Sequence, residues 1–409
     1  MKLAAMPWAA WTGMEPLLEA LDADGGATRV VGGAVRDTLL GLPVSDVDLA
    51  TRIAPGEVIE RLEAAGIKAV PTGLAHGTIT AVIAGRPVEV TTLRRDVETD
   101  GRHAVVAFTD DWQADAARRD FTINALSADP VSGEIFDYFG GLEDMATRSV
   151  RFIGDPRQRI AEDHLRILRF FRFHARFACS EPDCAALSAC SERANDLMAL
   201  SRERIADELM KLLALPDPGP SVGLMHQGGI FAPVLPEIGG DEVKLLGELI
   251  IREQGLGVPA DPLRRLAALL PAETRIAGEI AARLKMSNAA RVRLACAASR
   301  QPEDGKAEVG ALAYRFGLAC ALDRLLLGDV PPDAARLAEL DGWQRPRLPI
   351  GGGALIARGL GAGPLVAATL RQIEEEWVAA GFPEDAEFDA IVARRLDQAC
   401  AANSERDSQ

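Results

Sequence analysis

The sequence predicts an α+β fold, in which an N-terminal part of mixed strands and helices is followed by an all-helical remainder. Short runs rich in β-branched residues occur only in about the first 145 residues, where they alternate with helical patterns. After about residue 150, apolar residues recur at helical spacing and no further run of strand type follows. With 409 residues, the chain is long enough for two or three domains of roughly 100–200 residues each.

The strands of the N-terminal part are expected to be short and to end at turn residues. Gly85, Arg86 and Pro87 separate two β-branched runs, which is the pattern of a β-hairpin. Pro55 begins an amphipathic pattern, as is common in the first turn of a helix. The expected strands are 28–32, 47–51, 78–84, 88–93 and 134–138, and the expected helices are 34–40, 55–65 and 114–128.

The remainder is expected to consist of helices separated by proline-rich breaks at 217–220 and 331–332. No repeat of fixed period is present. The segments with helical periodicity are 157–177, 202–215, 242–253, 262–270, 273–285 and 365–380.

The charge of the chain is acidic on average but uneven. A net charge of −15 argues against a protein that coats nucleic acid non-specifically, and no DNA partner is expected. Only six of the 45 basic residues are lysines. The base composition of the genome explains this bias better than a need for phosphate-binding arginines does. Residues 148–176 nevertheless contain eight arginines and three acidic residues, a local cationic segment that the average hides.

The six cysteines form no CxxC pair and are expected to be free thiols of a reducing cytoplasm. Cys179, Cys184 and Cys190 cluster near His174, but zinc ligands usually have tighter, paired spacing, so a metal site there is disfavoured. The first residues lack the basic and long apolar regions of a signal peptide. No apolar run reaches the roughly 18 residues of a membrane span, so a cytoplasmic location without a membrane partner is expected.

Glycines and an arginine mark a candidate phosphate site. Gly32 and Gly33 end an expected strand and precede an expected helix, where backbone N–H groups can approach a phosphate. Arg36 would lie one turn into that helix, placed to contact a triphosphate. The alternative is an ordinary glycine turn.

Two carboxylates follow this element at a spacing that suits a metal ion. Asp46 and Asp48 are alternate residues of an expected strand and so would share a face. Adjacent carboxylates repel unless a cation lies between them, and their hard oxygen ligands suit Mg²⁺. The alternative is a solvated turn. Glu89, inside the second hairpin strand, is either a third carboxylate of this catalytic group or part of a solvated face.

Further polar residues recur at helical spacing. Asp120 and Asn124 are separated by four residues on an expected helix, so both could contact a ribose while Arg119 reaches a phosphate; capping or a surface ion pair is the alternative. Asp163, Arg166, Arg169 and Arg172 follow every third residue around one side of another expected helix. Apolar neighbours leave this helix little exposed face, so several of its arginines are expected to be partly buried or to line a cleft.

Residues 32–51 (GGAVRDTLLGLPVSDVDLAT) resemble the signature of the nucleotidyltransferase superfamily, in particular of class II tRNA nucleotidyltransferases and bacterial poly(A) polymerases. The resemblance continues in family order over roughly the first half of the chain. The further matching motifs are 76–83 (HGTITAVI), 88–103 (VEVTTLRRDVETDGRH), 118–126 (RRDFTINAL), 136–156, 159–173 (RIAEDHLRILRFFRF) and 201–213 (SRERIADELMKLL).

The resemblance implies an architecture and an activity. It implies a nucleotidyltransferase head at 1–145, a helical neck for base recognition at 146–215, and a helical body and tail at 216–409 that bind tRNA. It implies template-independent addition of C, C and A to the tRNA 3′ end from CTP and ATP. In that reaction the RNA 3′-hydroxyl attacks and pyrophosphate leaves, with Mg²⁺ as cofactor.

The resemblance also implies residue roles. Asp46 and Asp48 would hold the metal, and Arg119, Asp120 and Asn124 would recognise the ribose. Asp163 and Arg166 would read the edge of the incoming base. Arg169 and Arg172 would face phosphates or hold Asp163 in place.

Three readings of the activity stay open beside CCA addition. They are poly(A) polymerase activity, a split A-adding or CC-adding activity, and a catalytically inactive RNA-binding module. The motifs HGTIT, VEVTTLR and DGRH favour CCA addition. Residues 94–110 are expected to form a polar loop with His103 as a loop histidine, and by resemblance this loop is mobile and helps the change from C to A addition.

Overall fold

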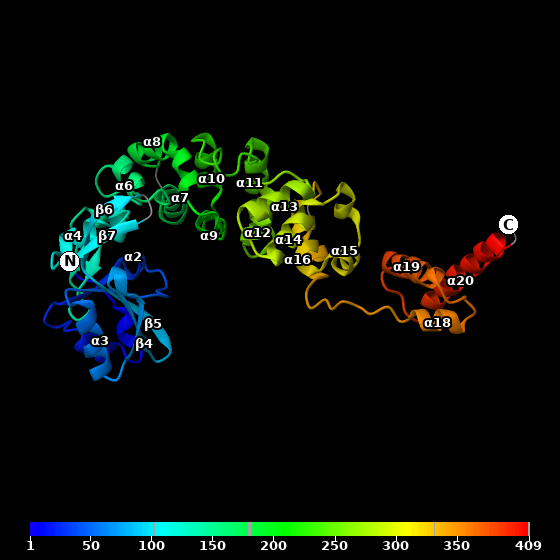
Figure 1. Cartoon of the computed structure of the whole chain (residues 1–409). Coiled ribbons are helices and arrows are strands. Elements are labelled where there is room, and N and C mark those ends of the chain that lie inside the picture. Colours follow the sequence, from blue (N-terminus) through cyan, green and yellow to red (C-terminus); the bar gives the residue numbers. More distant parts are fainter. Residues whose placement is uncertain (101–102, 179–180, 331, 408–409) are drawn as a thin grey trace. The chain divides into compact units, whose positions relative to one another are not determined.

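The structure is a computed structural model that describes residues 1–100, 103–178, 181–330 and 332–407, without the side chains of 96–105 and 402–407. The chain divides into two compact units, Met1–Pro236 and Glu237–Gln409 (Figure 1). All described strands belong to the first unit, and the second is helical. The predicted α+β class, with strands only in the N-terminal part, is therefore confirmed.

The first unit is built on a mixed seven-stranded sheet in the order β3-β4-β5-β2-β1-β8-β9. Its neighbouring strands are antiparallel, except that β2 and β5 run parallel. A separate hairpin is formed by β6 and β7. The strands are β1 Thr28–Val31, β2 Asp48–Thr51, β3 Lys68–Gly73, β4 Thr78–Ile83, β5 Arg86–Thr92, β6 Arg94–Asp100, β7 His103–Phe108, β8 Ser127–Ala128 and β9 Ile135–Phe136.

One face of this sheet carries the core of the first unit. Leu49 of β2 and Val90 of β5 are fully buried there among apolar residues of α1 and α3. Because successive strand residues point to opposite faces, Asp48 and Glu89 emerge on the other face. The two acids are direct partners in the parallel β2–β5 register.

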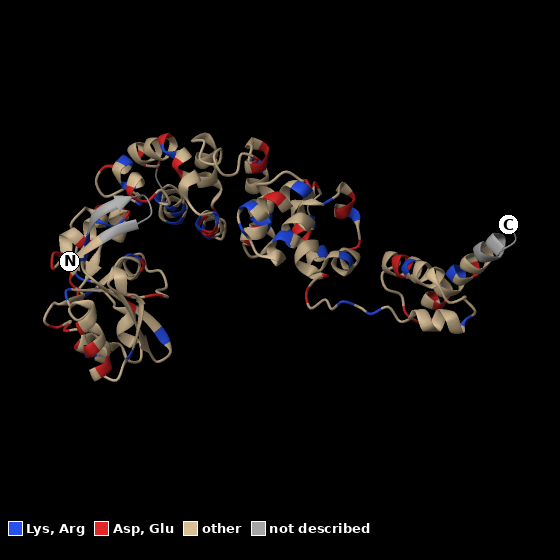
Figure 2. Ribbon diagram, in the orientation of Figure 1, with Lys and Arg blue, Asp and Glu red and all other residues tan. Residues whose placement is uncertain are grey.

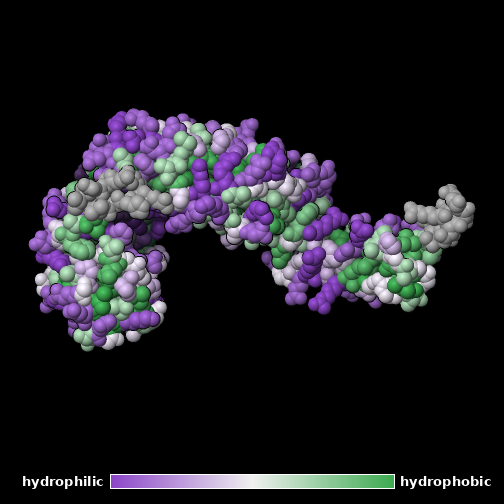
Figure 3. Space-filling model, viewed as in Figure 1, coloured by the Kyte–Doolittle hydropathy of each residue, from purple (hydrophilic) through white to green (hydrophobic). Residues whose placement is uncertain are grey.

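Helices cover the sheet and then continue the first unit without strands. They are α1 Met14–Ala20, α2 Gly33–Leu39, α3 Pro55–Ala64, α4 Trp112–Ala117, α5 Gly141–Ala146, α6 Pro156–Glu162, α7 Arg166–Phe177, α8 Cys184–Glu192, α9 Arg202–Leu213 and α10 Gly219–Gln227. Short 3₁₀ helices are η1 Pro7–Ala10, η2 Leu74–His76, η3 Thr122–Asn124 and η4 Ala194–Ala199. Hydrophilic residues cover most of α6 and α8 on the face shown in Figure 3.

Two predicted helices are shorter than expected. The helix predicted over 114–128 ends at Ala117, because the chain then turns to pair β8 with β1. The helix predicted over 157–177 is broken at Asp163, whose backbone is extended with φ −150°. Its side chain accepts a hydrogen bond from the backbone N–H of Leu165 at 3.2 Å, which competes with helical bonding.

The loop predicted over 94–110 is instead the β6–β7 hairpin. Val105 and Val106 are β-branched residues, which favour a strand. The charged residues that precede them favoured the prediction of a loop instead. The base of the hairpin is fixed, since Thr109 N–H donates to the Leu93 carbonyl at 2.9 Å. The side chain of His103 lies outside the described residues, so its role stays a prediction.

The second unit is a set of helices joined by short turns and one longer segment before α18 (Figure 1). Acidic and basic residues lie beside one another along α12 to α16 (Figure 2). Glu253, which is 1% exposed, accepts hydrogen bonds from Arg264 and Arg265 at 2.7 and 2.8 Å. The helices are α11 Gly240–Leu256, α12 Pro262–Ala268, α13 Thr274–Arg283, α14 Asn288–Ala298, η5 Pro302–Lys306, α15 Val309–Phe316, α16 Leu318–Leu327, α17 Ala334–Ala338, α18 Gly352–Ala357, α19 Pro364–Ala379 and α20 Asp385–Asp407.

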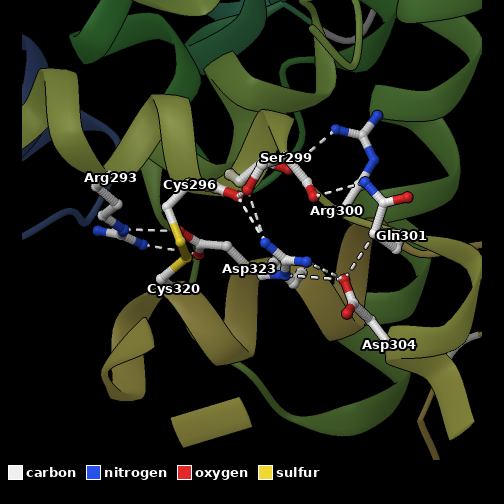
Figure 4. The surroundings of a disulfide bond; sticks show 10 residues. Arg293, Cys296, Ser299, Arg300, Gln301, Asp304, Cys320 and Asp323 are labelled. Carbon is white, nitrogen blue, oxygen red and sulfur yellow. Dashed lines mark hydrogen bonds and ion pairs between the residues drawn. A yellow bond between two sulfur atoms is a disulfide. The ribbon is translucent and has the colours of Figure 1, made fainter. Parts of the chain in front are cut away.

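A disulfide in this unit corrects the expectation of free thiols. Cys296 of α14 and Cys320 of α16 are joined, with their Cα atoms 6.2 Å apart (Figure 4). Residues that are 24 positions apart in sequence meet because α14 and α16 pack together. Cys184 and Cys190 are free, and Cys179 lies outside the described residues. Within the described part of the chain, no helix is long and apolar enough to cross a membrane.

Candidate active site

A pocket of about 340 Å³ in the first unit brings together nine of the ten residues predicted to bind nucleotide. Its lining comes from the glycine turn, the first residue of β2, the segment around η3, the junction of α6 with α7, and α7 itself. The lining residues are Gly32, Gly33, Arg36, Asp48, Arg119, Asp120, Asn124, Asp163, Arg166, Arg169 and Phe173. Arg172 lies outside this lining, and Phe173 is a member that sequence reasoning missed.

The glycine turn brings the backbone close to an arginine. Gly32 has φ +66°, which disfavours other residues, and a Cβ atom there would lie 2.9 Å from Nη1 of Arg119. Arg36 is 6% exposed; its guanidinium donates to the Asn124 side-chain oxygen and to Asp37. Burial lowers the pKa of Arg36, and the ion pair with Asp37 opposes this shift. The turn thus places two guanidinium groups at the pocket.

The three predicted catalytic carboxylates lie near one another. Asp46 precedes β2 and is exposed, so the prediction that it lies on the strand is wrong. Asp48 is exposed at the edge of the pocket, but partial desolvation by its surroundings raises its pKa, as do the charges of Glu89 and Asp46, while Arg119 opposes them. A cation beside Asp48 would relieve this repulsion.

The donor set fits Mg²⁺, which takes one or two carboxylates and completes its coordination with water and substrate phosphate. Among the described residues, no group of three or more His, Cys, Asp or Glu side chains is arranged so that it could hold a metal ion.

Asp120 is the centre of a buried network. Its carboxylate accepts hydrogen bonds from Asn124 Nδ2 at 2.9 Å, from Arg169 Nε at 2.7 Å and from the Phe121 backbone at 2.9 Å. Burial alone would raise the pKa of Asp120, but Arg169 and these hydrogen bonds hold it below its usual value. Asp120 and Asn124 are therefore neighbours as predicted, although no α-helix connects them.

The break between α6 and α7 holds the two predicted base-reading side chains. Arg166 is 9% exposed and donates to the backbone carbonyls of Arg118 and Arg159 at 3.0 and 2.7 Å, and to Glu162 at 2.7 Å. Three of its five N–H donors are thus used within the protein, which leaves enough for a base edge. Asp163 pairs with Arg204 of α9 at 3.2 Å.

Arg166, Arg169 and Arg172 form the arginine row of α7, and Glu208 of α9 is a buried partner of this row. Sequence reasoning did not single out Glu208. Its carboxylate accepts from Arg172 Nε at 2.6 Å and lies 3.9 Å from Arg169, with 3% of the residue exposed. The matching motif 201–213 contained the signal, since Glu208 lies between the buried residues Ile205 and Leu212 on one helical face. The expectation that this arginine row is partly buried is confirmed.

Comparisons with known proteins agree with this arrangement. The family described as the poly A polymerase head domain matches residues 28–151, and that described as a probable RNA and SrmB-binding site of polymerase A matches 182–240. The mitochondrial CCA tRNA nucleotidyltransferase 1 of Mus musculus is 35% identical over 397 residues, which are 90% of this chain and 87% of the mouse protein. The CCA-adding enzyme of Streptococcus gordonii is 38% identical over 235 residues, 56% of each chain.

Solved structures share the fold over almost the whole chain. A Bacillus stearothermophilus CCA-adding enzyme in complex with CTP has a TM-score of 0.74 and 28% identity, covering 94% of this chain and 98% of its own. A Thermotoga maritima CCA-adding enzyme complexed with tRNA has a TM-score of 0.69 at 19% identity, covering 95% of each chain.

Proposed function

Since the chain belongs to the family of CCA-adding tRNA nucleotidyltransferases, we propose that it adds C, C and A to the 3′ end of tRNA without a template. CTP and ATP are its nucleotide substrates, and pyrophosphate is the leaving group. The observation that carries the proposal is a single pocket in which Asp163 and Arg166 lie together with Asp48 and three further arginines. Such a pocket can bind a base at one end and a triphosphate near a carboxylate.

The proposal gives each side of the pocket a task. Arg36 and Arg119 bind the triphosphate, with Gly32 and Gly33 allowing its close approach. Asp46 and Asp48 hold Mg²⁺, which when bound supplies positive charge for the attacking and leaving oxygens. Glu89 raises the proton affinity of Asp48 across the β2–β5 register rather than contacting substrate.

The other side of the pocket selects the nucleotide. Asp163 accepts hydrogen bonds from the base edge, and Arg166 donates hydrogen bonds to it. This arrangement of acceptor and donor suits cytosine and adenine. Asp120 already accepts three hydrogen bonds from the protein, so its part in ribose recognition is to hold Asn124 and Arg169 in place.

Arg172, one helical turn further along α7, completes the assigned nucleotide-binding residues. Arg172 pairs with Glu208, which also lies near Arg169. Its effect on the nucleotide is therefore indirect, through the placement of Arg169.

The division into a head at 1–145, a neck at 146–215 and a tRNA-binding body and tail at 216–409 is part of the proposal. So is a cytoplasmic location, although the mouse relative is named as mitochondrial. Localisation of the tagged chain by fractionation tests the second point.

The experiment that tests the proposal supplies each nucleotide separately to tRNA that ends without C, C and A. We expect two C additions from CTP, one A addition from ATP on the CC-ended tRNA, and then termination. A long A tail would instead identify a poly(A) polymerase, and addition of only A or only CC would identify a split activity.

Replacement of a metal-holding carboxylate tests the chemistry separately from RNA binding. Asp46→Ala is expected to abolish transfer and to leave tRNA binding, measured by filter retention, nearly unchanged. Glu60→Ala, which removes an exposed acid of α3, is the control and is expected to keep full activity. Continued transfer by Asp46→Ala would overturn the two-carboxylate assignment.

A further inference from the structure

Phe173 lies where three predicted nucleotide-binding arginines meet. It belongs to α7, is 5% exposed and lines the pocket. The guanidinium carbons of Arg36, Arg169 and Arg172 lie over its ring at 5.3, 5.4 and 4.6 Å from the ring centroid. A cation within about 6 Å of an aromatic centroid is attracted by the negative face of the ring.

Carboxylates also hold these arginines, and Arg169 is paired with Asp120. Arg36 is paired with Asp37, and Arg172 with Glu208. Each bond fixes one edge of a planar guanidinium, and the like charges around the ring repel one another. The ring supplies a weak attraction to the faces of the guanidinium groups without occupying their N–H donors.

The ring itself is held firmly. Its centroid lies 5.1 Å from that of Phe121 and 5.6 Å from that of Phe177, within the range of aromatic packing. Phe121 is fully buried beside the Asp120 network. The guanidinium carbon of Arg36 lies 4.4 Å from the ring centroid of Phe177. Phe173 is thus a rigid surface against which the guanidinium groups can be placed.

We propose that Phe173 is a positioning residue of the nucleotide pocket, which orients Arg36 and Arg169 through the face of its ring. This inference rests on the proposed function, because those arginines are taken as nucleotide ligands. It assigns the nucleotide affinity of the site in part to a side chain that has no hydrogen-bonding group.

The test is a series of phenylalanines with one, two and three ring fluorines at position 173. Fluorination keeps the volume nearly constant while it withdraws electrons from the ring face. We expect the KM for CTP and for ATP to rise stepwise with fluorine number, reaching roughly five- to thirtyfold, with a smaller change in kcat. Equilibrium binding of CTP without tRNA is expected to weaken in the same order.

The same series at Phe170 is the control, since this ring is also buried on α7 but packs on the rings of Phe152 and Phe171. An unchanged KM across the series at 173, or an equal change at 170, would overturn the proposal and leave Phe173 as core packing. The CTP-binding readout does not depend on CCA addition. Failure of the wild-type enzyme to complete tRNA would therefore refute the proposed function independently of this result.

Discussion

Loss of the Glu208 charge tests whether the arginine row is stabilised from α9. Glu208→Gln keeps the size of the side chain and one acceptor oxygen but removes the charge that faces Arg172 at 2.6 Å and Arg169 at 3.9 Å. A hydrogen bond to a charged group contributes about 1.5–3 kcal/mol, and breaking a buried pair outright costs about 3–5 kcal/mol. Since glutamine retains part of the bond, we expect a loss of about 2 kcal/mol.

The chain offers a matched control on the same helix. Asp207 pairs with Lys211 at the same distance of 2.6 Å, but the two side chains are 60% and 53% exposed. Solvent screening limits such a pair to about 0.5 kcal/mol. Asp207→Asn is therefore expected to change stability by about a quarter of the effect of Glu208→Gln, although the two ion pairs have the same length.

The assay is thermal unfolding of the full chain, followed through the transition of the first unit. For a unit of this size, 2 kcal/mol corresponds to a decrease in Tm of roughly 4–8 °C, against less than about 2 °C for the control. The KM for CTP is expected to rise as well, because Arg169 and Arg172 lose a neighbouring anion. Equal shifts in Tm for the two variants would refute the argument that burial decides the strength of these pairs.

Three further outcomes follow from the site and from the disulfide. Because the pKa of Asp48 is raised, its negative charge destabilises the folded state above that pKa. Without Mg²⁺, Asp48→Asn is therefore expected to have a higher Tm than the wild type at pH 7. This difference in Tm is expected to disappear as the pH falls. No gap at pH 7 would contradict the sign. Asp163→Ala is expected to relax nucleotide choice more than it lowers the rate of C addition, and strict C and A selectivity in competition assays would refute base reading by this residue. Replacement of both Cys296 and Cys320 by serine is expected to destabilise the second unit by about 3 kcal/mol in urea unfolding, and an unchanged midpoint would show that the bond constrains nothing.

The fold could be predicted where one pattern governs a whole element. The runs before and after Gly85 form an antiparallel hairpin as expected, because alternation and turn residues agree there. The same approach fails at Asp163, where a single side-chain bond to the backbone interrupts a continuous helical pattern. Periodicity averages over several residues and therefore does not register one local competitor.

Most residues that line the pocket could be named from the sequence, but their contacts could not. Their spacing predicts that Asp120 and Asn124 lie on one face of a helix. In the structure they are neighbours through a 3₁₀ turn and a direct hydrogen bond. Glu208 and the Cys296–Cys320 bond depend on the packing of separate helices. Such long-range pairings have no signature in the local sequence.

The anchoring of Arg166 has a consequence for how the specificity of this pocket can change over time. Two of its contacts are backbone carbonyls, those of residues 118 and 159, which every amino acid possesses. Substitutions at these two positions therefore leave both acceptors in place, and only the third contact, that with Glu162, depends on a neighbouring side chain. Redirecting this guanidinium would require the main chain between α4 and α7 to move, or Arg166 itself to be replaced.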